Sequence, residues 1–277
     1  MSRGKAAAGE SSARPLIESA GLSDVGRRRK SNEDSFAISN DQTLFIVADG
    51  MGGHAAGEVA SRLAVESIER HISGSDPRKE PTIPASFRSP SGGEAGLPPP
   101  ARRVLNAIRL ANQEIVRSVR KDSSMRGMGT TVVIALFQRS RAFIGSVGDS
   151  RAYLVRDGAL RQLTSDHTLV NEQVRAGALS TQEARRHPAR NILTRAVGSQ
   201  EDVEPDLVEQ DLRPGDTLLL CSDGLTTMVE DADILKTVLE HGDDPKAACR
   251  ALIDLANERG GDDNVTVVLA RVPAPAR

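Results

Sequence analysis

The chain has 277 residues, with 36 lysines and arginines against 38 aspartates and glutamates and a formal net charge of −2. This length allows one large domain or two small ones, and the balanced charge gives no general attraction to nucleic acid or an anionic membrane. The apolar runs are much shorter than the roughly 20 residues of a membrane-spanning helix. The two cysteines, Cys221 and Cys249, form no CxxC pair, so we expect both in the core of a cytoplasmic protein.

Two segments read as irregular. Residues 1–20 are expected to be a disordered tail, because their first part is rich in Ser, Ala and Gly and lacks the apolar core of a secretory signal. The stretch at about 73–100 holds half of the 14 prolines, mixed with Ser and Gly. It is either a linker between two domains or an insertion in one. We favour a single domain over residues 21–273 with this insertion, because candidate site residues lie on both sides of it.

The rest of the chain alternates between two kinds of periodicity. In chain order, we expect a strand at 43–48, helices at 55–72 and 101–121, strands at 130–137, 141–147, 152–155, 159–163 and 216–221, a helix at 245–258 and a strand at 265–270. Asp157-Gly158 is a hairpin turn, which makes the strands on either side of it antiparallel. Because the order lacks regular βαβ alternation, we predict an α+β fold in which two sheets pack together with helices outside them.

Four aspartates stand at the ends of predicted strands. Asp49, Asp149 and Asp223 each follow an apolar run and precede a small residue, and Asp263 comes just before the last strand. Strand ends and starts can share one edge of an antiparallel sheet, so these carboxylates can gather there. Their mutual repulsion favours a divalent cation among them, and hard oxygen ligands favour Mg²⁺ or Mn²⁺. The simpler alternative, that each Asp-Gly marks a turn, weakens with each repetition.

Basic residues at 27–30 lie just before Glu33 and Asp34 in the sequence. An arginine can hold phosphate through two N–H groups, and the two acids can bind a metal or orient its waters. A solvated basic run or a weak nucleic-acid patch is the alternative, although no aromatic residues are interleaved to stack on bases. His54 follows a glycine-rich loop and can donate a proton to a leaving group; otherwise it is a turn or capping residue.

Taken together, these motifs resemble the metal-dependent serine/threonine protein phosphatases of type 2C, in their short bacterial form. The resemblance runs from about residue 23 to 272. The matching segments, in order, are Arg29 with Asn32-Glu33-Asp34, 49–54, 129–131, 148–151, 163–164 with 166–167, 194–198, 222–224 and 263–264.

The resemblance implies a β-sandwich of two antiparallel sheets flanked by helix pairs, in α-β-β-α layers, with a two-ion site at one end. In the family, the residues matching Asp49, Gly50, Asp223 and Asp263 hold the two ions, and the residue matching Asp149 helps to hold a third, weaker one. Glu33 looks like a further metal ligand and Asp34 a partner of the ligands. Arg29 matches the arginine that binds substrate phosphate, and His54 the general acid.

The activity implied is hydrolysis of phosphoserine and phosphothreonine in proteins, with water as the nucleophile and Mn²⁺ or Mg²⁺ as cofactor. It would reverse the action of a Ser/Thr protein kinase, and we expect a monomer. Residues 171–191 match the mobile flap of the family. The rival hypotheses are a non-catalytic binding module, a nucleotide switch and a different metallohydrolase. The first would be expected to lack a metal aspartate, and the second needs a GxxxxGK[ST] loop that the sequence does not contain.

Overall fold

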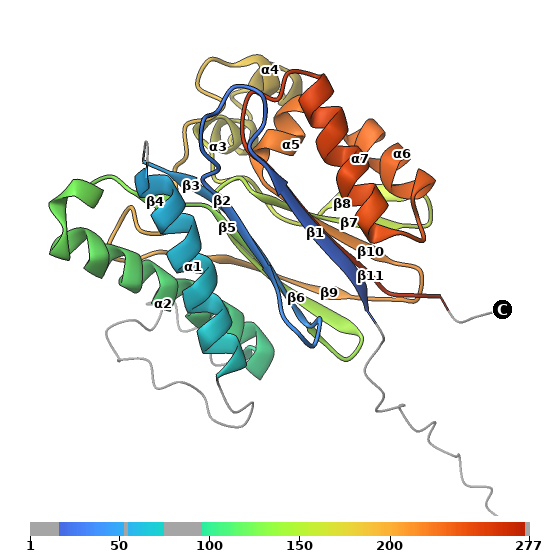
Figure 1. Ribbon diagram of the computed structural model, residues 1–277, viewed down its shortest axis with the longest axis horizontal. Helices are drawn as coiled ribbons and strands as arrows, with labels where there is room; N and C mark the ends of the chain where they lie inside the picture. The colour runs from blue at the N-terminus through green and yellow to red at the C-terminus, as the bar shows by residue number, and fades with distance from the viewer. Residues whose placement is uncertain (1–16, 53–54, 75–95, 275–277) are drawn as a thin grey trace, which may run out of the picture.

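The computed structural model describes residues 17–52, 55–74 and 96–274 (Figure 1). A five-stranded sheet has the order β1-β11-β10-β7-β8, and a second sheet has the order β2-β3-β5-β6-β9, with β4 paired to β3. All the strand pairs are antiparallel. The strands are β1 (Glu18–Asp24), β2 (Asp34–Ile38), β3 (Leu44–Met51), β4 (Gly129–Thr130), β5 (Val132–Gln138), β6 (Arg141–Val147), β7 (Arg151–Arg156), β8 (Ala159–Gln162), β9 (Asp206–Asp211), β10 (Thr217–Cys221) and β11 (Val265–Arg271).

Helices cover both outer faces of the sandwich (Figure 1). They are α1 (Ala55–Ser73), α2 (Pro99–Lys121), α3 (Leu169–Arg175), α4 (Thr181–Arg186), α5 (Asp223–Met228), α6 (Asp231–Glu240) and α7 (Pro245–Glu258), with a short 3₁₀ turn at Ser123–Met125. One apolar cluster lies between α1, α2 and the β3 sheet, a second lies between the sheets, and a third lies between α6, α7 and the β10 sheet. The central strands are therefore buried on both faces, which explains their nearly continuous apolar sequences.

The predicted α+β sandwich is confirmed. The three predicted helices are present, and Pro245 occupies the first turn of α7 behind the capping carboxylate of Asp244. The strand expected at 130–137 is interrupted at Thr131, so β4 and β5 are separate. No helix in the described part of the chain is long and apolar enough to cross a membrane.

Two expected boundaries need correction. Ile17 is buried and Glu18–Asp24 pairs along its whole length with β11, so a tail reaching residue 20 is wrong for the last of those residues. Of the expected insertion at 73–100, the first residue belongs to α1 and the last two to α2, while 75–95 lie outside the described residues.

The directions of the strands show at which end of the sandwich each loop between strands lies. The Asp157-Gly158 turn joins β7 to β8 as predicted, and it lies at the end where β7 finishes. At the other end, where β7 begins, the chain passes from the β6 of one sheet to the β7 of the other through Asp149. The candidate site is built at this second end.

Candidate active site

A cavity of about 560 Å³ opens at the end of the sandwich where β3 and β10 finish. The residues predicted as metal or phosphate ligands that line it are Arg29, Glu33, Asp49, Gly50, Asp149, Asp223 and Asp263. The structure thus brings together side chains that are more than two hundred positions apart in the sequence.

Each carboxylate reaches the cavity from a different element. Asp49 lies near the end of β3, and Asp149 lies in the connection that crosses between the sheets. Asp223 is the first residue of α5, two residues after the end of β10, and Asp263 comes two residues before β11. The prediction that strand ends and starts gather these four aspartates at one end of the sandwich is therefore confirmed by the cavity they share.

Gly50 is surrounded by backbone. A Cβ at this position would lie 2.1 Å from the carbonyl oxygen of Gly57 and 2.6 Å from that of Glu33. The Gly50 N–H donates to the Glu33 carbonyl over 3.1 Å, which ties the end of β3 to the chain just before β2. Only glycine fits here, so the backbone itself forms this part of the cavity wall.

Asp34 does not line the cavity but lies behind it, opposite Asp49 in the β2–β3 register. Its Oδ2 accepts hydrogen bonds from the Ser222 hydroxyl at 2.8 Å and the Thr266 hydroxyl at 2.6 Å. This carboxylate therefore links β2 to β10 and β11 beneath the ligand-bearing ends, which fits the supporting position expected from the sequence.

Asn264 organises the loop that carries Arg29. Its Nδ2 donates to the carbonyls of Val25 and Ser31, both over 2.9 Å, and its Oδ1 accepts from the Glu33 N–H over 2.8 Å. Arg29 Nη2 donates to Asp263 Oδ2 over 2.7 Å, so the guanidinium is held at the cavity. The sequence placed Asn264 in a motif without giving it a role, because its partners belong to a distant loop.

Because like charges are buried together at this site, the ionised form of its carboxylates is strongly disfavoured when no cation is bound. The pKa of Asp49 is raised well above its usual range by burial and by neighbouring aspartates, and that of Asp223 is also raised, by burial and by Asp263. Burial and the charge of Asp223 raise the pKa of Asp149 to about 8. Burial also raises the pKa of Asp34 to about 7. One buried oxygen each of Asp34 and Asp223 has no hydrogen-bond partner.

These observations fit a bound cation, because a positive ion in the cavity would satisfy the unpaired oxygen of Asp223 and offset the repulsion among the aspartates. Within residues 17–52, 55–74 and 96–274, no three His, Cys, Asp or Glu side chains are close enough to complete a metal cage by themselves. The donor set is carboxylate and backbone oxygen, to which water must be added. That combination suits Mg²⁺ or Mn²⁺, which retain waters, and not a closed zinc site.

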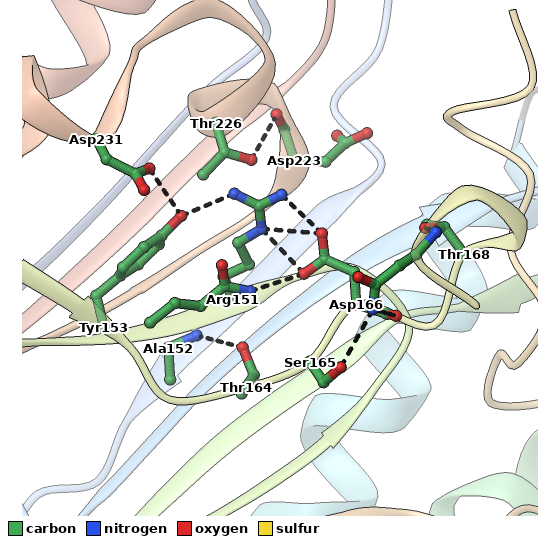
Figure 2. Close-up of polar contacts among 12 residues, drawn as sticks. Arg151, Ala152, Tyr153, Thr164, Ser165, Asp166, Thr168, Asp223, Thr226 and Asp231 are labelled. Carbon is green, nitrogen blue, oxygen red and sulfur yellow. Dashed lines mark hydrogen bonds and ion pairs between the residues drawn. The ribbon is translucent and has the colours of Figure 1, made fainter. Parts of the chain in front are cut away.

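A second network, missed by the sequence analysis, lies beside the carboxylates (Figure 2). Arg151 Nη2 donates to Asp166 Oδ2 over 2.6 Å, and its Nε is 3.0 Å from Oδ1 of the same carboxylate. Its Nη1 donates to the Tyr153 hydroxyl over 2.8 Å. The network borders another cavity, of about 480 Å³, that shares Asp149 and Asp223 with the first. The matching segments 148–151 and 166–167 contain Arg151 and Asp166, but their spacing does not reveal that the two residues pair.

Two expectations concern segments around the cavity mouth. His54 lies outside the described residues, so its role stays a prediction. The segment 171–191, expected as a flap, contains most of α3 and all of α4, and its last residue, Asn191, lines both cavities.

Comparison with known proteins agrees with this geometry. The model of the family described as protein phosphatase 2C matches residues 26–256. The serine/threonine phosphatase stp of Listeria innocua is 41% identical over 249 residues, which cover 89% of this chain and 92% of that protein.

Solved structures are similar as well. The serine/threonine phosphatase PstP/Ppp of Mycobacterium tuberculosis superimposes with a TM-score of 0.79 at 38% identity, covering 93% of this chain and 99% of that one. The catalytic domain of PstP in complex with two manganese ions gives a TM-score of 0.76 at 36% identity, covering 93% and 98%. The predicted resemblance is confirmed, and the chain belongs to the protein phosphatase 2C family of serine/threonine protein phosphatases.

Proposed function

We propose that this protein hydrolyses phosphoserine and phosphothreonine in other proteins with the help of two Mn²⁺ or Mg²⁺ ions bound in the carboxylate cavity. The observation that carries the proposal is the convergence of Asp49, Asp149, Asp223 and Asp263 on one cavity, with Arg29 at its side. The raised pKa values of the buried aspartates support a cation there, and the membership of the chain in the phosphatase family supports the reaction.

The chain offers a definite set of ligands. Asp49 and the Gly50 carbonyl would hold the ions from β3, Asp223 and Asp263 from the other sheet, and Glu33 directly or through water. Asp149, which borders both cavities, would help to hold a third, weaker ion. When bound, the ions supply the positive charge that makes a water molecule acidic and stabilises the phosphoryl group.

The remaining residues bind and orient. Arg29, anchored by Asp263, would hold the phosphoryl oxygens through its N–H groups. Asp34 fixes Ser222 and Thr266 and so keeps the ends of β10 and β11 in place. We further propose His54 as the proton donor to the leaving alkoxide, from its position after the glycine-rich loop.

The cysteines are unsuited to a covalent phosphocysteine route. Cys221 and Cys249 are both buried, and burial raises the pKa of each thiol to about 12. Neither therefore provides a thiolate at neutral pH. The burial of both thiols is consistent with a mechanism in which water, and not a cysteine, is the nucleophile.

The partners follow from the reaction. We propose that the substrates are phosphorylated proteins, among them a Ser/Thr protein kinase, and that the enzyme acts as a monomer in the cytoplasm. The relatives named serine/threonine phosphatases support the substrate class, and the free, buried cysteines support a reducing compartment.

Phosphate release from a phosphothreonine peptide tests the function. We expect release with Mn²⁺, none after EDTA, and a loss of about two orders of magnitude or more in Asp223→Asn, because a ligand charge is removed from the ions. Asp254→Asn, the same change at an exposed position of α7, should behave as wild type. Metal-loaded wild type that releases no phosphate would contradict the function, and activity after complete metal removal would reject the metal site.

A further inference from the structure

One wall of the carboxylate cavity is a short irregular segment, residues 198–201, which we call the 198–201 wall. Its Ser199 and Gln200 are exposed side chains that line the cavity. Neither carries a charge. Hydroxyl and amide groups match the N–H and C=O groups of a polypeptide, whereas a phosphate dianion calls for a cation such as Arg29.

A single buried side chain holds this wall from behind. Asn112 of α2 is 1% exposed, and its Oδ1 accepts from the Gly198 N–H over 2.6 Å. Its Nδ2 donates to the carbonyls of Gln200 at 3.0 Å and Glu201 at 2.9 Å. Both the oxygen and the nitrogen of the Asn112 amide therefore bond to the backbone of this one segment. Without these bonds, buried polar groups of the amide and of the wall would have no partner.

The wall also lies unusually close to the helix. Gly198 has a φ of +87°, and a Cβ there would be 2.3 Å from Cγ2 of Ile115, a fully buried residue of α2. Any side chain at 198 would push the wall away from the helix. Two independent effects therefore hold the wall against α2: the close packing of Gly198 on Ile115 and the hydrogen bonds with Asn112.

The other side of the wall leads to the metal-binding strand. Val197 and Thr130 exchange two backbone hydrogen bonds of 2.9 Å, and the Thr130 hydroxyl donates to the Asp49 carbonyl over 2.8 Å. The wall is therefore fixed between α2 and the end of β3, at a set distance from the carboxylates.

We propose that Asn112 is a positioning residue that holds the 198–201 wall as the surface on which the polypeptide flanking the phosphorylated residue lies. This rests on the proposed function and identifies how that site binds protein rather than phosphate. Asn112 touches no reacting atom. It acts through the wall, so a defect at Asn112 should affect peptide substrates more than a small phosphate ester.

The test compares two substrates, a phosphothreonine peptide and p-nitrophenyl phosphate. In Asn112→Asp the size is kept, but the Nδ2 amide group that donates to the carbonyls of Gln200 and Glu201 is replaced by a carboxylate oxygen, which can only accept. We expect the peptide KM to rise about tenfold, as loss of such hydrogen bonds implies. Turnover of p-nitrophenyl phosphate should stay within about twofold of wild type, because the ester has no polypeptide to lie on the wall.

Asn106→Asp is the matched control, since Asn106 lies on the same helix, is half-buried and lines neither cavity. It should leave both substrates unchanged. Because Asn112 is buried, exposed Gln200→Ala provides a variant that keeps the fold, and it should raise the peptide KM alone. Thermal unfolding of each variant, measured alongside, identifies any loss of the folded state.

Three results would overturn the proposal: parallel loss of both substrates in Gln200→Ala, an unchanged peptide KM in both Asn112→Asp and Gln200→Ala, or the same peptide defect in Asn106→Asp. Wild type that turns over p-nitrophenyl phosphate but no phosphopeptide would contradict the proposed function itself, and the role of the wall with it.

Discussion

Gly50 illustrates how one residue can be required for two reasons. The sequence shows a small residue after Asp49, and the family resemblance predicted that Gly50 helps to hold an ion. The structure adds a second reason, which no local pattern reveals: the carbonyl oxygens of Gly57 and Glu33 occupy the space that a Cβ at Gly50 would need. Likewise, the sequence indicated Asp263, but not that Asn264 beside it holds the Arg29 loop.

We expect Gly50→Ala to lower the free energy of unfolding by about 1–3 kcal/mol, because the methyl group collides with two backbone oxygens that cannot rotate away. Mn²⁺ affinity should fall as well, since the end of β3 must shift. Urea denaturation and metal titration measure the two effects. Gly96→Ala is the control, because no atom lies within 4 Å of a Cβ at that position. Equal behaviour of the two variants would contradict the steric argument.

At the scale of elements, the strands that the sequence missed share one property. β1, β2 and β9 all lie at sheet edges, where one neighbour is absent and polar residues are tolerated. The central strands were recognised because both faces are buried and their sequences are apolar. β8 is also an edge strand, yet it was predicted, because the Asp157-Gly158 turn marks it.

The Arg151–Asp166 ion pair connects β7 to the segment that leads into α3. Its two side chains are more buried than those of ion pairs on the surface. The exposed fractions of the two side chains are 24% and 16%. Asp166→Asn leaves the guanidinium without its counter-charge, so we expect a loss of about 2–3 kcal/mol in unfolding free energy, below the full cost for a deeply buried pair.

Urea denaturation measures this loss, and the exposed Arg141–Asp211 pair provides the comparison. Its side chains are 53% and 73% exposed, so Asp211→Asn should cost less than about 1 kcal/mol. Comparable losses in the two variants would show that burial of the pair is not the deciding factor.

For the whole molecule, the carboxylate cavity draws on both sheets. Asp49 comes from the β3 sheet, Asp223 and Asp263 from the ends of strands in the other, and Asp149 from the crossing between them. The central strands and the three long helices α1, α2 and α7 could be predicted, but the sheet order could not, because no local pattern states which strand lies beside which. Metal binding at such a place should stabilise the entire sandwich.

The pH dependence of stability follows from the raised pKa values. Asp34 and Asp149, at about 7 and about 8 against an ordinary 3.8, favour their protonated forms when folded. Their contribution to stability is complete below pH 4 and is lost as the pH rises through 7 to 8. In EDTA, we therefore expect the Tm to fall by about 5 °C or more between pH 5.5 and 8.

With Mn²⁺, the change should be opposite, because the ion binds the ionised carboxylates and its stabilising effect grows with pH. Thermal unfolding at each pH, with EDTA or Mn²⁺, measures both slopes. Asp149→Asn removes one titrating group and should make both slopes shallower. A metal-free Tm that rises toward pH 8 would refute the assignment of these carboxylates.

The turn at Asp157-Gly158 has a practical consequence. It is exposed, no atom lies within 4 Å of a Cβ at Gly158, and it belongs to the end of the sandwich remote from the carboxylates. A reactive cysteine or a short tag inserted there would attach the molecule to a solid support with its cavity facing the solution. Immobilised in one orientation, the enzyme could be challenged with whole phosphoproteins flowing past it.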